Sequence, residues 1–331
     1  MALSDVFSTM LSAFCLFLAL CSSNSHCLDV LNNSSSRATA KPDSMSTESA
    51  PTDAGILVYS RGNSVMKLPL DNISSGPEEM VSLIYQIALG MAVDCQERFI
   101  YWSDLEGPTI NRVRFDGTDR KVVLDRDSVY SGDGLAIDPI SRTLFWTDAT
   151  HGHIACARLN DTEMQAKILI ADNLSSPGSI AVHPSKGLIF WADWDSSQSS
   201  APKIEVARMD GSERRTIVSS NLMLPHALTV DLDTDEICWA DAGTHNVECA
   251  SLDGSNRSIV VAADSSISPF RMTVYRGVLY WTDWARDNIL SVHKDGAGES
   301  TITSLLPSGS PGTLHAVTAV SRECFGFGAF V

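Results

Sequence analysis

A short motif recurs through most of this chain and constrains its fold more than any other feature: an aromatic residue, Trp, a small residue and Asp. Five copies occupy residues 101–104, 145–148, 190–193, 238–241 and 280–283, the fourth with Cys at its first position. A degenerate copy at residues 58–61 has Tyr59 at the Trp position. Consecutive copies lie 42 to 48 residues apart. Six copies at one period predict a repeat protein.

Each repeat has the same internal order, which predicts four short strands. In one repeat an apolar segment at residues 134–138 is followed by a turn at 139–142 and then by the tetrad. A third segment ends in an Asp-Gly turn, as at residues 116–117, and a fourth apolar segment follows, as at 121–124. Short strands separated by Asp and Gly turns indicate an all-β repeat.

Four-stranded sheets with two apolar faces bury both faces when they pack around an axis, which predicts a β-propeller. The first repeat lacks its innermost strand, and residues 314–320 form an innermost-type strand with no tetrad after it. The two fragments complete one blade. We therefore expect an all-β, six-bladed propeller with four-stranded blades, the first closed by the C-terminal strand. An open array of repeats is the alternative, but an open array would leave the terminal half-repeat without a strand to pair with.

The tetrad is expected to be structural. Its Trp supplies a large packing area between neighbouring blades. Its small residue and its Asp are expected to cap the strand end by hydrogen bonding to nearby backbone. Five tetrad carboxylates in one chain therefore do not indicate catalysis.

The chain outside the repeats predicts a secreted protein. Residues 10–21 form an apolar run, shorter than the roughly 20 residues that a membrane span needs. We interpret residues 1–25 as a signal peptide, although Asp5 is unusual there, and an uncleaved anchor is the alternative. Residues 26–54 are expected to be a flexible linker rich in Ser, Thr and Asn, residues 55–324 the propeller, and residues 325–331 a tail.

Charge excludes two partner classes. The formal net charge is −16, so nucleic acid and anionic lipid, which both select basic surfaces, are not expected partners. No second apolar run predicts a membrane span in the mature chain. Sequons for N-glycosylation occur at six positions, namely Asn32, Asn33, Asn72, Asn160, Asn173 and Asn256.

Several segments resemble a known family. They are residues 90–95, 65–70, 238–244 with 248–249, and 314–319 followed by Cys324. These segments resemble the YWTD propellers, also called low-density-lipoprotein-receptor class B repeats, and within them the C-terminal propellers of the nidogens. Nidogens carry further globular, EGF-like and thyroglobulin-like modules, for which this chain has no room.

Cysteine placement on the repeats predicts two disulfides. Cys238 and Cys249 lie opposite each other on neighbouring strands of one blade, where a cross-strand bridge fits. Cys95 follows the inner strand of the second blade and Cys324 follows the closing strand of the first, so a Cys95–Cys324 bridge would lock the ring. Cys156 either pairs with Cys27 or is a buried free thiol.

Loops before the inner strands and loops after the tetrads are expected on one face, here called the top face, where a rigid scaffold presents binding residues. Mixed aromatic, basic and acidic residues there are typical of an interface hot spot. The candidate partner-binding residues are Asp133, His151, Trp194, His226, Phe270, Arg271, Trp284, Arg286 and His315. Trp194 and Trp284 could instead pack between blades, and the histidines could respond to pH.

The resemblance implies a basement-membrane protein that docks a laminin γ-chain EGF-like module and has no catalytic residue, cofactor or metal. The alternative is the ectodomain, or a fragment, of an endocytic receptor for lipoprotein or Wnt-pathway ligands. A remote alternative is a metal-dependent propeller hydrolase, which needs several carboxylates at the axis. The axis offers one acid, Asp133, and no GxSxG, HExxH or P-loop motif occurs.

Overall fold

The computed structural model describes residues 55–159, 163–195, 200–295, 301–309 and 312–325. The chain divides into two units, residues 1–52 and 53–331, and only the second contains described residues. The predicted signal peptide and linker, Cys27, Asn32, Asn33 and Asn160 lie outside the described residues, as do residues 326–331 of the predicted tail.

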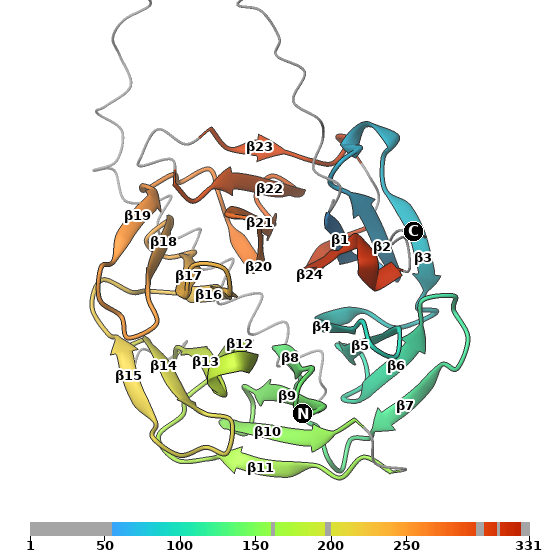
Figure 1. Ribbon diagram of the computed structural model, residues 1–331, viewed down its shortest axis with the longest axis horizontal. Coiled ribbons are helices and arrows are strands. Elements are labelled where there is room, and N and C mark those ends of the chain that lie inside the picture. Colours follow the sequence, from blue (N-terminus) through green and yellow to red (C-terminus); the bar gives the residue numbers. More distant parts are fainter. Residues whose placement is uncertain (1–54, 160–162, 196–199, 296–300, 310–311, 326–331) are drawn as a thin grey trace, which may run out of the picture. The chain divides into compact units, whose positions relative to one another are not determined.

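The described residues form six four-stranded sheets, which Figure 1 shows as blades around a central axis. From the inner to the outer edge, the strands of blade 1 are β24 (Leu314–Ser321), β1 (Gly55–Arg61), β2 (Ser64–Pro69) and β3 (Glu78–Ser82). Those of blade 2 are β4 (Ala88–Asp94), β5 (Phe99–Asp104), β6 (Ile110–Arg114) and β7 (Lys121–Leu124). Those of blade 3 are β8 (Leu135–Asp138), β9 (Thr143–Asp148), β10 (His153–Arg158) and β11 (Lys167–Ile170).

The remaining blades repeat this order. The strands of blade 4 are β12 (Pro177–His183), β13 (Leu188–Asp193), β14 (Lys203–Arg208) and β15 (Arg215–Val218). Those of blade 5 are β16 (Pro225–Asp231), β17 (Glu236–Asp241), β18 (Asn246–Ser251) and β19 (Ser258–Val261). Those of blade 6 are β20 (Pro269–Tyr275), β21 (Val278–Asp283), β22 (Asn288–His293) and β23 (Thr303–Ser304). Short 3₁₀ turns are η1 (Ile73–Ser75), η2 (Pro184–Lys186) and η3 (Arg322–Phe325).

The ring closes as the repeat count predicts. The inner strands contact one another in the order β24, β4, β8, β12, β16, β20 and back to β24. Strand β24 pairs antiparallel with β1, with Val317 opposite Tyr59 and Val320 opposite Ile56. The last strand of the chain therefore supplies the inner edge of the first blade, and the predicted six-bladed fold is confirmed.

The tetrad tryptophans pack between blades, as predicted. Trp102, Trp146, Trp191, Trp239 and Trp281 are fully buried. Each packs in one cluster with strands of the preceding blade; Trp146 of blade 3, for example, shares a cluster with Phe99 and Tyr101 of blade 2. Tyr59 takes this place in blade 1 and packs with Tyr280 and Ile289 of blade 6. A large aromatic residue at one repeated position thus packs at all six interfaces.

The tetrad aspartates hold the top-face loops. The carboxylate of Asp241 accepts hydrogen bonds from the backbone N–H of Leu224, in the loop before its blade, and of Gly243, just after the tetrad, both at 2.9 Å. The aspartates of the other full tetrads make similar bonds to backbone N–H groups. The capping role predicted for this Asp is confirmed.

The small tetrad residue does something different from what the sequence predicted. The Thr147 hydroxyl accepts a hydrogen bond from the N–H of Gly134 in its own blade at 2.9 Å and donates one to the carbonyl of Gly178 in the next blade at 2.5 Å. The hydroxyls of Ser60, Ser103 and Thr282 make the same pair of bonds. Where the third tetrad residue is Ser or Thr, its hydroxyl joins two blades instead of capping a strand end.

The described residues contain two disulfides, one between blades 1 and 2 and one within blade 5. Cys95 and Cys324 are bridged with their Cα atoms 4.7 Å apart, and Cys238 and Cys249 with theirs 4.0 Å apart. Both are the predicted pairs. Cys156 is a free, half-buried thiol whose pKa is raised by burial.

Candidate functional site

Six candidate residues gather on the top face, and we call them the axial cluster. They are Asp133, His226, Phe270, Arg271, Trp284 and His315. They come from the N-terminal ends of inner strands β16, β20 and β24, from the residues before β8, and from the turn after β21. These strands surround the axis, so residues far apart in sequence meet there (Figure 1).

An aromatic stack forms one side of the axial cluster. The Phe270 ring lies between those of His226 and Trp284, with centroids 4.7 Å and 4.2 Å away, and stacks on both. His315 meets Phe270 edge-on at 5.9 Å. Trp194 of blade 4 extends the stack, its ring centroid 5.9 Å from that of His226. Stacked and edge-on rings at these separations stabilise one another beyond simple area burial.

Arg271 ties the axial cluster together across the axis. Its guanidinium lies over the Phe270 ring, 4.2 Å from the centroid. Its Nη1 donates to the Phe270 carbonyl at 3.0 Å and lies 2.9 Å from Nδ1 of His226. Its Nη2 donates to the backbone carbonyl of Asp133 at 2.6 Å, which joins blade 6 to blade 3. One buried cation therefore fixes residues from three blades.

The strand register explains why Arg271 reaches so far. Arg271 comes one residue before Met272, which pairs with the tetrad residue Trp281. The other blades have small residues at this position, namely Gly90, Gly134, Ser179, Ala227 and Ala316. A Cβ atom at Gly134 would lie 2.6 Å from the carbonyl oxygen of Gly178, so inner strands approach closely here. Blade 6 alone places a long side chain at this position.

Burial shifts the ionisation of the axial cluster. It lowers the pKa of His226 to about 3 and that of His315 to about 4, with the positive charge of Arg271 acting in the same direction. Burial also lowers the pKa of Arg271 to about 10 and raises that of Asp133, and the attraction between these two groups opposes both shifts. Both histidines are thus neutral in the folded chain between pH 5 and 7.

Two of the predicted partner-binding residues make their contacts elsewhere. His151 packs edge-on against Tyr130, with ring centroids 4.5 Å apart, and lies beside the tetrad carboxylate Asp148. Arg286 is paired with Asp264, at 3.2 Å. The structure therefore brings together seven of the nine predicted residues, counting Trp194.

Trp194 and Trp284 are half-buried on the top face and do not fill the blade-to-blade positions of the tetrad tryptophans. The indole Nε1 of Trp284 donates to the Leu314 carbonyl at 2.7 Å, which fixes the ring beside the axis. Both indoles leave part of their surface accessible, as a binding surface requires.

Exposed apolar residues in two top-face loops were not predicted. Tyr85, in the loop between β3 and β4, is 88% exposed and its neighbour Ile84 is 62% exposed. Both have positive φ angles, which are uncommon for such residues. Tyr130, in the loop between β7 and β8, is 40% exposed. In the sequence, Tyr130 stands in a mostly polar loop, whereas Ile84 and Tyr85 belong to the mostly apolar segment 83–87 and are not marked out from it.

Comparison with known proteins agrees with this geometry. The family model for low-density lipoprotein receptor repeat class B matches residues 98–139, 142–184 and 187–232. A Drosophila melanogaster nidogen is 33% identical over 273 residues, which is 82% of this chain and 19% of that protein. The chain thus spans about a fifth of the length of that relative.

A human low-density lipoprotein receptor-related protein 5-like protein is 33% identical over 211 residues, 64% of this chain and 81% of that protein. Among solved structures, one titled as a nidogen/laminin complex matches with a TM-score of 0.72 and 28% identity, over 80% of this chain and 98% of the matched chain. In the part of the chain that the structure describes, no helix is long and apolar enough to cross a membrane.

Proposed function

Because the chain belongs to the low-density lipoprotein receptor class B repeat family, we propose that it is a secreted, non-enzymatic propeller that binds a protein partner on its top face. The favoured partner is an EGF-like module of a laminin γ chain in an extracellular matrix. The solved structure of a nidogen/laminin complex, which matches nearly the whole of this propeller, supports this choice.

The axial cluster carries the proposal. Its Trp284, together with the neighbouring Trp194, presents a partly accessible indole beside a buried Arg271 that holds the surrounding residues in place. Aromatic residues on a rigid, preorganised base are the usual anchors of protein interfaces, because little side-chain entropy is lost on binding.

Catalysis is not part of the proposal. The axial cluster has one carboxylate, that of Asp133, and the charge of Arg271 acts on it. A metal-dependent hydrolase needs several carboxylates converging on one hard cation. A single acid beside a guanidinium does not provide them.

Glycosylation is proposed to leave the top face accessible. Asn72 and Asn256 are exposed and lie in the turns between the third and fourth strands of blades 1 and 5, on the opposite face. Asn173 is also exposed, but it lies between β11 and β12, on the top-face side. Glycans at the first two sites would cover the face that we do not propose for binding.

A second candidate function is that of a receptor ectodomain, or a fragment of one, for lipoprotein or Wnt-pathway ligands. The similarity to the receptor-related protein 5-like protein favours it. The same top face would be used, with a different partner.

Surface plasmon resonance on the secreted full chain tests both candidates, with laminin γ EGF-like modules, lipoproteins and Wnt-pathway ligands as analytes. We expect binding to the laminin modules, and we expect Trp194→Ala and Trp284→Ala each to weaken it by roughly tenfold or more. The matched control is Val122→Ser on the outer strand β7, where the side chain is exposed but far from the axis along the blade.

No binding to the laminin modules would reject the favoured partner, and binding to a receptor ligand instead would support the second candidate. If both tryptophan variants bound the partner with the affinity of the parent, and circular dichroism showed that all chains were folded, the top-face site would be rejected.

A further inference from the structure

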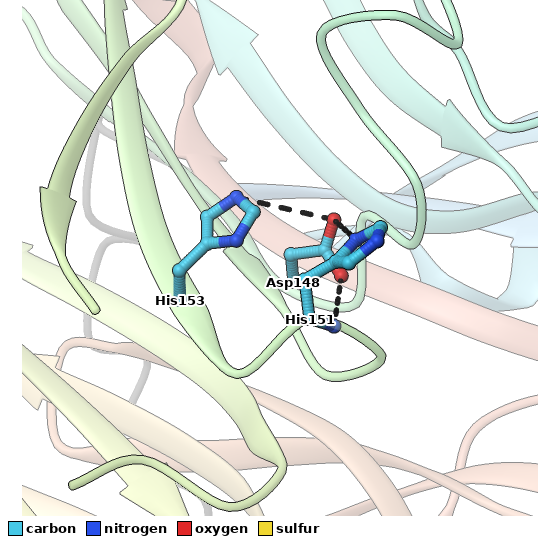
Figure 2. Close-up of side chains that lie close together, drawn as sticks. All are labelled: Asp148, His151 and His153. Carbon is cyan, nitrogen blue, oxygen red and sulfur yellow. Dashed lines mark hydrogen bonds and ion pairs between the residues drawn. The ribbon is translucent and has the colours of Figure 1, made fainter. Parts of the chain in front are cut away.

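The structure points to a second site that does not involve the axial cluster. We propose that Asp148, His151 and His153 bind a divalent transition-metal ion, with Zn²⁺ as the expected ion (Figure 2). All three lie at the top-face edge of blade 3, where β9 turns into β10. Two imidazoles and a carboxylate are ligands that zinc accepts, and three protein ligands leave one position of a tetrahedral ion open.

The separations of the ligand atoms suit a tetrahedral ion. One potential ligand atom from each residue lies within 4.8 Å of the other two. Nδ1 of His151 is 3.5 Å from Oδ2 of Asp148, and Nε2 of His153 is 4.0 Å from the same oxygen. An ion with bonds of roughly 2.0–2.1 Å keeps its ligand atoms about 3.4 Å apart. Small rotations of the two rings therefore suffice.

The ring nitrogens of His151 and His153 have no competing hydrogen bond among the described residues. The two rings lie nearly parallel, with centroids 6.0 Å apart, and both face the Asp148 carboxylate in Figure 2. Their lone pairs are therefore available to an ion.

Blades 5 and 6 show that the fold does not require these histidines. Position for position after the tetrad Asp, blade 5 has Thr244 and Asn246, and blade 6 has Arg286 and Asn288. Asn246 and Asn288 lie opposite their tetrad aspartates, as His153 lies opposite Asp148, and each accepts backbone hydrogen bonds near the outer strand. Blade 3 replaces this structural asparagine by a histidine.

Asp148 is preorganised by its structural role. It is fully buried, and its Oδ2 accepts hydrogen bonds from the backbone N–H of Tyr130 at 3.0 Å and of Ser131 at 3.2 Å. Its Oδ1 accepts one from the N–H of His151 at 2.9 Å. A carboxylate held in this way needs no ordering when an ion arrives, whereas a mobile ligand would lose entropy.

The site opens into a pocket, so an ion can enter and keep an exchangeable ligand. The pocket measures about 560 Å³ and is lined by all three candidate ligands together with the loop before β8 and part of β11. Arg126 and Asp127 also line it, so its charges are mixed. The fourth ligand would be a water molecule or a donor atom from a bound partner.

Isothermal titration calorimetry of Zn²⁺ into the untagged, chelator-treated full chain tests the proposal. We expect one ion per chain, and absorption bands of tetrahedral Co²⁺ when cobalt replaces zinc. The double variant His151→Thr/His153→Asn, which copies the turn of blade 5, should weaken zinc binding by at least about tenfold. It should fold normally because blade 5 uses these residues.

The matched control is His293→Asn, which removes an exposed histidine at the end of β22 and should leave zinc binding unchanged. Absence of zinc binding in the micromolar range, or equal binding by the parent and the double variant, would overturn the proposal. Laminin binding by the double variant is a separate readout, because neither substituted residue belongs to the axial cluster.

Discussion

At the scale of single residues, the axial cluster shows how one substitution in a repeat creates a site. Five blades have Gly, Ser or Ala where blade 6 has Arg271. The other blades have no long side chain at this position. In blade 6 the Arg271 guanidinium reaches toward the axis and places a positive charge near His226 and His315. Burial, with this charge acting in the same direction, lowers the pKa of both imidazoles and keeps them neutral beside the Phe270 ring.

The stability of the fold should fall in mild acid because of these two histidines. Their pKa values are about 3 and about 4 in the folded chain, against 6.5 for an ordinary histidine. The unfolded chain therefore binds more protons between about pH 4 and 6.5, and stability declines as the pH falls through this window. The slope should approach about 1.4 kcal/mol per pH unit for each histidine.

Urea unfolding of the parent, His226→Gln and His315→Gln between pH 5 and 7 measures this slope. Each variant should show a shallower decline than the parent, and the exposed-site control Ile259→Ser should not differ from it. A slope that is unchanged in both glutamine variants would contradict the assignment.

What the sequence predicts at this scale depends on whether a contact is local or repeated. The tetrad Trp and Asp act on neighbouring segments in the same way in most blades, so their roles could be predicted from the repeat. Arg271 donates to a carbonyl 138 residues away. No pattern in the sequence marks that contact, because it depends on the diameter of the ring.

At the scale of elements, two kinds of link hold the blades together. The tetrad hydroxyls join neighbouring blades at four of the six interfaces, and Ala192 and Ala240 leave the other two without this link. Ser179 makes a longer bond to the Leu228 carbonyl, at 3.4 Å, between blades 4 and 5. The Cys95–Cys324 disulfide links blades 1 and 2 covalently, whereas Cys238–Cys249 lies within blade 5, and the two differ greatly in the length of chain that they close.

Removing the Cys95–Cys324 bridge should destabilise the fold more than removing the hairpin bridge. The sequence separations are 229 and 11 residues. Chain entropy assigns contributions of about 5 kcal/mol to the longer loop and about 3 kcal/mol to the shorter one. The comparison is between Cys95→Ala/Cys324→Ala and Cys238→Val/Cys249→Val, since valine retains packing at the fully buried hairpin site.

Guanidinium unfolding under oxidising conditions gives both free energies. A loss for the Cys95–Cys324 variant that is no larger than the loss for the hairpin variant would contradict the clasp role. Both pairs could be placed from the sequence because each cysteine has a defined position on a repeat.

At the scale of the whole molecule, stability depends on closure. Each tetrad Trp packs against the preceding blade, and Tyr59 of blade 1 packs against blade 6. These contacts therefore run around the whole ring. Without β24, strand β1 would lose its inner partner. The Ser60 hydroxyl would also lose the hydrogen bond that it accepts from the backbone N–H of Ala316. The edge of β1 would then be free to pair with another chain.

A chain that ends at residue 309 should therefore lose the single cooperative unfolding transition of the parent and associate through β1. Differential scanning calorimetry and light scattering measure the two effects. A peptide of residues 312–325 added in trans should restore part of the transition by supplying β24. The control is a chain that ends at Phe325. A truncated chain with the parent's transition within a few degrees would contradict the closure argument.

The closing strand also sets an order of events during synthesis. Blades 2 to 6 are each built from one continuous stretch of chain, whereas β1 is made first and β24 last. Roughly 250 residues separate them, which take on the order of 12 to 50 seconds to translate at about 5–20 residues per second. During that interval the edge of β1 has no partner within its own chain. An unpaired strand edge can pair with another chain, so the nascent protein passes through a stage in which its first repeat is open to misassociation.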